Sequence, residues 1–93
     1  MKNGKAVLIR TYSAGVHFGQ LASHKDKEVV LKKAQRIWYW KGANTLHEIS
    51  LRGCGVGSKI SEPISEITLT EAIEILPMTD TALKTMARLE WVK

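Results

Sequence analysis

The residues best suited to binding chemistry lie at positions 36–44, where an aromatic run is bracketed by basic side chains. This stretch holds three of the six aromatic residues of the chain and two cations, Arg36 and Lys41. Because side chains alternate between the two faces of a strand, Arg36, Trp38 and Trp40 are expected on one face. A flat aromatic and cationic face can stack a ring and neutralise a phosphate, but it can equally be half of a hydrophobic core or a subunit interface.

The segment after the aromatic run favours the binding interpretation. Residues 41–44 lead directly into a predicted helix, whose free backbone amides can bind an anion. A ring stacked on Trp38 or Trp40 could then have its phosphate held by basic side chains and the helix start. The candidate ligand-binding residues are therefore Arg10, Arg36, Trp38, Trp40, Lys41 and Asn44. The alternative is that the two tryptophans are core residues, because the chain has only one phenylalanine.

No other motif predicts catalysis or a metal. Residues 53–59 resemble a phosphate-binding loop, but Ser58 precedes Lys59, whereas the P-loop has Gly-Lys followed by Ser or Thr. The three histidines have no neighbour at a zinc-ligand spacing, and Cys54 is expected to be a small buried thiol. The glutamates of residues 62–74 are typical of a solvated face. The sequence therefore predicts a protein that is not an enzyme and that needs no cofactor.

Length and composition predict one cytoplasmic domain over residues 1–93. This length can bury an adequate core, and a single cysteine excludes an internal disulfide. No apolar run is long enough for a signal peptide or a membrane helix, so no membrane partner is expected.

Charge is distributed unevenly between the two halves of the chain. Residues 1–41 contain nine lysines and arginines and two acids, while residues 42–93 contain five and seven, which gives +7 and −2. Such a chain can attract an anionic ligand to its first half, or it can pair its halves across the subunits of a homo-oligomer. The alternative is that these lysines are solvated on strand edges, where they discourage aggregation.

Hydrophobic alternation and turn residues predict an α+β fold. Gly19 within a strand indicates a bulge or a close approach of two backbones. Thr45 and Glu48 have the capping-box spacing, Gly53 ends that helix, and a second helix begins at Thr79–Asp80. Strands are expected at 5–12, 16–23, 28–40 and 64–76, the last being one strand or two joined at 70–72, with a loop at 54–63. The result is a curved antiparallel sheet of four to five strands with two short helices, or a small open barrel.

The runs at 10–19, 34–46, 61–63 and 71–75 also resemble a protein family. They are similar to a family of small uncharacterised proteins encoded by tailed phages and prophages, over nearly the whole chain. The resemblance implies expression in the host cytoplasm. There, small phage proteins without catalytic activity often block a host factor, sequester a signal nucleotide or serve an assembly.

Three hypotheses of function follow. The first is a phage accessory protein that oligomerises and binds a nucleotide-type anion of host defence without chemistry. The second is a nucleic-acid-binding module, because the pI is about 9.6 and strand aromatics suit stacking on single strands. The third is a structural or virion-assembly protein in which Trp38 and Trp40 are core and the apolar tail at 89–92 seals a subunit interface. Whether these tryptophans are buried or exposed distinguishes core from site.

Overall fold

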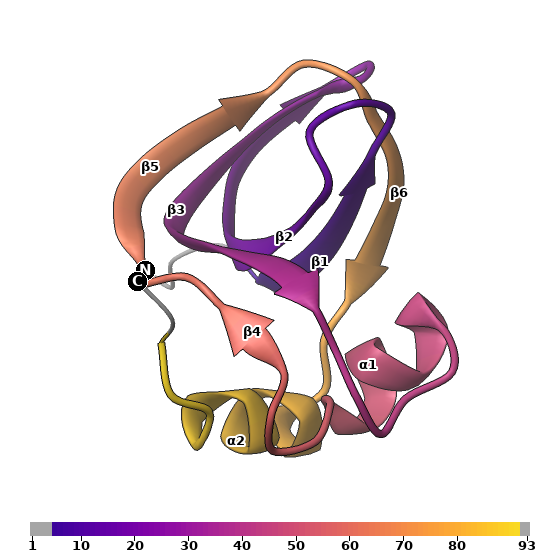
Figure 1. Ribbon diagram of the computed structural model, residues 1–93. Coiled ribbons are helices and arrows are strands. Elements are labelled where there is room, and N and C mark those ends of the chain that lie inside the picture. Colours follow the sequence, from indigo (N-terminus) through magenta and orange to yellow (C-terminus); the bar gives the residue numbers. More distant parts are fainter. Residues whose placement is uncertain (1–4, 92–93) are drawn as a thin grey trace.

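A strongly curved sheet of six antiparallel strands covers two short helices in the computed structural model, which describes residues 5–91 (Figure 1). The elements in chain order are β1 (Ala6–Thr11), β2 (Val16–Lys25), β3 (Glu28–Tyr39), α1 (Leu46–Arg52), β4 (Lys59–Ile60), β5 (Ile64–Leu69), β6 (Ala72–Pro77) and α2 (Asp80–Ala87). The predicted α+β class is confirmed. The strand count exceeds the prediction by one, because Lys59–Ile60, expected in a loop, pairs with the end of β3.

The long strand β3 organises the sheet. Along one edge it pairs with β2, and along the other its first half pairs with β5 and its end with β4. The sheet continues through β1 to β6, so β5 and β6 lie at its two edges. The sheet is not closed, because β5 and β6 form no ladder within residues 5–91, so the predicted variant of a small open barrel fits only roughly.

A β-bulge interrupts the pairing of β2 with β3. The register shifts between Phe18 and Gln20, and Lys33 opposite has a positive φ of 52°. A Cβ on Gly19 would lie 2.8 Å from the carbonyl oxygen of Lys32. The expected close backbone approach at Gly19 is therefore confirmed, and it explains why this strand position has no side chain.

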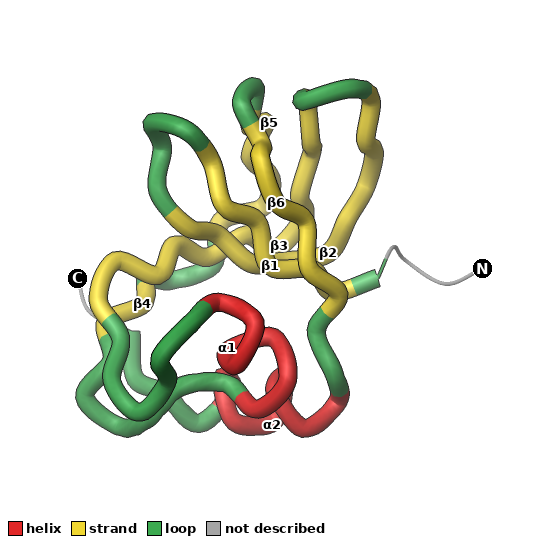
Figure 2. The backbone as a smooth tube through the Cα atoms, turned by 90° about the vertical axis from the view of Figure 1, so that its right-hand side faces the viewer, coloured by secondary structure: helices red, strands yellow, loops and turns green. Residues whose placement is uncertain are grey.

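The two faces of the curved sheet bury separate cores. Leu8 of β1 joins Ile49 of α1 and Met86 of α2 in the helix-side core. Both helices lie on this side of the sheet (Figure 2). Val7 and Ile9, which flank Leu8, point instead into the concave side of the sheet. This inner core also contains Val29, Leu31, Ala34, Leu69 and Ala72. Because side chains alternate between the two faces of a strand, β1 contributes residues to both the helix-side core and the inner core.

Both helices begin at the predicted threonine caps. The Thr45 hydroxyl accepts the Glu48 amide at 3.3 Å, and Thr79 accepts the Ala82 amide at 3.0 Å. The Glu48 carboxylate accepts the Asn44 amide at 3.1 Å. Gly53 ends α1 with a φ of 78°, as predicted. These contacts satisfy the free Glu48 amide in the first turn of α1 and the amide of Asn44, which lies just before the cap.

The C-terminal residues divide between core and surface. Leu89 is buried in the helix-side core, while Trp91 is about half exposed and its backbone bridges to Ile60. Val92, predicted as part of the apolar tail, lies outside the described residues, as do residues 1–4 and 93. Within residues 5–91 no helix has the length and apolar character needed to cross a membrane.

Candidate ligand-binding site

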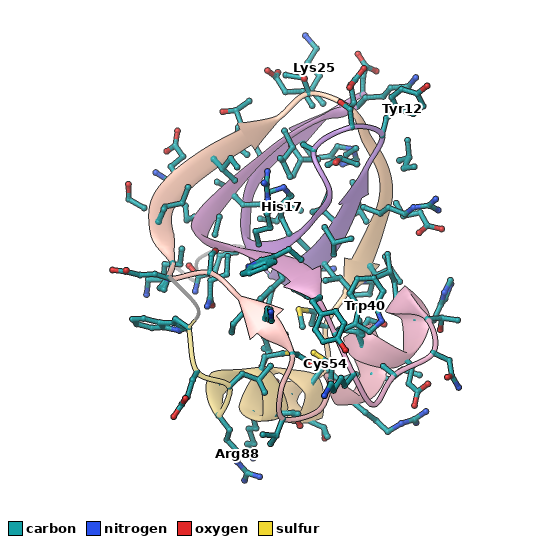
Figure 3. All side chains as sticks on the ribbon, viewed as in Figure 1. Tyr12, His17, Lys25, Trp40, Cys54 and Arg88 are labelled. Carbon is teal, nitrogen blue, oxygen red and sulfur yellow. The ribbon has the colours of Figure 1, made fainter. Side chains whose placement is uncertain are left out.

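Trp38 and Trp40 occupy different environments. Trp38 lies near the end of β3 with 51% of its surface exposed. Since β3 ends at Tyr39, Trp40 lies beyond the strand, next to α1 (Figure 3). It packs against the helix-side core, as does Leu46. Trp40 therefore departs from the expected alternation, and only Trp38 has a largely free ring.

Three shallow depressions share lining residues, and tryptophans line two of them. The central depression, of about 450 Å³, lies between residues 13–16 and the end of β3, and Arg36, Trp38 and Trp40 line it. The β5-side depression, of about 300 Å³, shares Arg36 as a wall and is completed by His17, Ala34, Gln35, Ser61, Ile64 and Ile67. The α1-side depression, of about 380 Å³, shares Val16 and Trp40 with the central one and is completed by Arg10, Thr45, Leu46, His47 and Glu74.

Lys59 adds a cation that the sequence analysis missed. Its pairing with Tyr39 places the Nζ atom 5.3 Å from the centroid of the Trp38 ring and 5.9 Å from that of Tyr39. Both distances are within the range of cation–π attraction. In the sequence, the only sign of β4 is that a polar residue, Lys59, precedes an apolar one, Ile60. A strand of two residues is too short to be recognised from an alternating pattern.

Arg36 is the basic residue common to two depressions. Its backbone amide donates to the Ser61 hydroxyl at 2.8 Å, which joins β3 to the start of the β5 segment. Within residues 5–91 its guanidinium forms no ion pair, unlike Arg10, which lies 3.8 Å from Glu74. Arg36 is therefore the cation best placed to meet an anionic ligand.

Internal hydrogen bonds hold the loop that walls the central depression. The Thr11 hydroxyl donates to the Gly15 carbonyl at 2.8 Å and accepts the Ala14 amide at 2.8 Å. The Ser13 hydroxyl donates to Glu71 at 2.8 Å. This wall is thus already in place before a ligand arrives, which reduces the ordering cost of binding.

His17 supports the same loop from inside the curved sheet (Figure 3). Its Nε2 atom lies 2.9 Å from the Ala14 carbonyl, and because a carbonyl only accepts, Nε2 carries the proton. Burial lowers the pKa of His17; the bond to Ala14 opposes this shift, and nearby Arg36 adds to it. His17 is consequently a neutral support of the site near pH 7.

Two of the candidate residues lie apart from the others. The Lys41 amide donates to the Ser58 hydroxyl at 3.0 Å, and its side chain runs beside Gly57, outside all three depressions. The Asn44 amide is taken by Glu48, whose carboxylate also disfavours an anion at the start of α1. The structure thus brings together Arg10, Arg36, Trp38 and Trp40, and separates them from Lys41 and Asn44.

The remaining chemically notable residues have structural surroundings. Cys54 is buried between the sheet and α2, as expected, and burial raises the pKa of its thiol (Figure 3). Ser58, from the glycine-rich loop, is buried and caps the Lys41 amide. In the part of the chain that the structure describes, no three His, Cys, Asp or Glu side chains gather as a metal site would require.

The fold and the site together define a small α+β protein with an open aromatic and basic surface. A family model, Domain of unknown function (DUF6948), matches residues 4–86. The chain therefore belongs to this family, and the expected membership of an uncharacterised family is confirmed. No curated protein and no solved structure matches the chain. The phage setting stays a prediction.

Proposed function

We propose that this protein binds a nucleotide-type ligand without chemical conversion, with a ring stacked on Trp38 and phosphate paired with Arg36 and Lys59. The observation that carries the proposal is the half-exposed Trp38 ring beside two cations. Burying such a ring against a ligand gains stacking and apolar contact, and the cations neutralise the phosphate in the same place.

Electrostatics support the same ligand class. The chain carries a net charge of +5, which raises the local concentration of anions. The Lys59 ammonium rests over the Trp38 ring when no anion is present, a contact worth only about 0.5–1 kcal/mol at an exposed site. A phosphate therefore competes readily for Lys59, and its arrival leaves the ring face free for stacking.

The biological setting extends the proposal. The resemblance to phage-encoded proteins supports action in the host cytoplasm, where a binder acts by sequestering its ligand, such as a nucleotide signal of host defence. The unequal charges of the two halves support a homo-oligomer in which these halves pair. The alternative of a virion-assembly or other interaction protein is favoured by Tyr39 and Trp91, which are 45% and 52% exposed near β4.

Isothermal titration calorimetry against cyclic and linear nucleotides tests the proposal. We expect binding of at least one nucleotide by the unmodified protein and clearly weaker binding by Trp38→Ala and Arg36→Gln. Trp91→Ala is the matched control, because Trp91 is as exposed as Trp38 but lines none of the three depressions. No heat with any nucleotide, or equal loss in both tryptophan variants, would reject the proposed site.

A further inference from the structure

We infer that the ligand is a single-stranded nucleic-acid segment of about three nucleotides, one for each depression, an inference that rests on the proposed function. The observation behind it is that the depressions form a chain. The β5-side and central depressions share Arg36, and the central and α1-side depressions share Val16 and Trp40.

The size and openness of each depression suit one nucleotide unit of a longer ligand. The volumes, about 300, 450 and 380 Å³, are at the low end for small-molecule sites, and the depressions are open to solvent. A site for a small molecule normally buries most of its ligand, and an open depression covers less of it. A strand that crosses all three buries several rings on one continuous surface.

The charges indicate where the phosphates lie. Arg36 forms the wall between two depressions, which is where the phosphate between two successive nucleosides must pass. Lys59 lies beside Trp38 and can reach the central nucleotide. In the α1-side depression Arg10 is paired with Glu74 at 3.8 Å, so that depression suits a terminal base and sugar better than a phosphate.

The ring-binding surfaces imply little choice of base. Trp38 and the exposed part of Trp40 offer aromatic faces on which any base can stack, and the half-exposed Ile64 offers an apolar contact. Single strands are favoured over duplexes, because paired bases are not free to stack on side chains.

Fluorescence anisotropy with labelled thymidine oligonucleotides of one to six nucleotides tests the inference, with thymidine monophosphate measured by calorimetry. Stacking one base on an aromatic side chain contributes roughly 5- to 140-fold in affinity, and an apolar contact contributes less. We therefore expect affinity to rise with each nucleotide up to three and then to reach a plateau. The logarithm of the dissociation constant should rise with the logarithm of salt concentration by about 0.7 per contacted phosphate.

The outcomes separate this inference from the proposed function. Equal affinity for the monophosphate and the trinucleotide would overturn the inference and retain a nucleotide site. Affinity that still rises steeply at six nucleotides would also overturn it, as would equal binding of a duplex. If thymidine monophosphate, the oligonucleotides and all cyclic and linear nucleotides tested by calorimetry fail to bind, both the nucleotide site and the single-strand inference are wrong.

Variants at the two ends of the chain of depressions locate the strand. Ile64→Ser and His47→Ala should each move the plateau from three nucleotides to two, because each removes one terminal contact. Glu74→Gln should tighten trinucleotide binding several-fold by removing the acid beside Arg10. Lys84→Gln, on α2 outside the depressions, is the control and should change neither quantity. If affinity still levels off at three nucleotides in both Ile64→Ser and His47→Ala, the proposed path of the strand across the three depressions is wrong.

Discussion

Replacing Trp38 by alanine separates binding from packing within the aromatic run. Full burial of a large apolar side chain contributes about 3 kcal/mol, and 51% of Trp38 is exposed, so we expect a loss of only about 1–1.5 kcal/mol in the free energy of unfolding. The neighbouring Ile37 is 2% exposed, and Ile37→Ala should cost about 2–5 kcal/mol. Loss of one stacked base should weaken ligand binding by about 1–3 kcal/mol, roughly 5- to 140-fold.

Two assays on the same variant give these two quantities. Urea unfolding followed by circular dichroism measures stability, and calorimetry measures the dissociation constant of the bound nucleotide. Trp91→Ala provides the matched exposed tryptophan and should retain full affinity. Two results would refute a binding role for Trp38. If Trp38→Ala is unfolded, Trp38 is a core residue; if the variant is folded and binds with unchanged affinity, Trp38 does not contact the ligand.

Three further predictions concern the supporting structure. Gly19→Ala should destabilise by about 1–3 kcal/mol in urea unfolding, because the new Cβ meets the Lys32 carbonyl oxygen at 2.8 Å; an unchanged midpoint would contradict the close approach. Thr45→Ala should cost about 0.5–2 kcal/mol through loss of the bond to the Glu48 amide, and a wild-type melting temperature would argue against this cap. The lowered pKa of His17 means that the unfolded chain protonates first, so stability should fall as the pH drops below about 6.5, and His17→Gln should flatten this fall; an identical pH profile in the variant would count against it.

The strands and helices could be predicted largely because their signals are local. Thr45 with Glu48 marks a helix start through contacts within one turn, and Gly53 marks its end by a backbone conformation that glycine favours. The sixth strand was missed because Lys59 and Ile60 become a strand only by pairing with β3, which is distant in the sequence. Whether β5 and β6 meet and close the sheet likewise depends on how strongly the sheet curves. The bulge at Lys33 helps to set this curvature, which an alternating pattern of residues does not predict.

The candidate site was predicted in part for similar reasons. Arg36 and Trp38 follow from strand alternation, which is a local rule. Trp40 departs from it because the strand stops one residue earlier, and Lys41 turns toward Gly57 because tertiary contacts with the glycine-rich loop hold its backbone. Lys59 could not be placed beside Trp38 without the register between β4 and β3.

The most direct test of the binding surface is an NMR titration of the labelled protein with a thymidine trinucleotide. We expect the largest amide shifts in residues 13–17, at Arg36 and Trp38, in residues 45–47 and in residues 59–64, with Trp indole signals shifting alongside them. Residues 80–87 of α2 and the turn at 26–27 should be unaffected. Saturable shifts confined to α2 or to that turn, or no shifts at millimolar trinucleotide, would contradict a ligand site at Arg36 and Trp38.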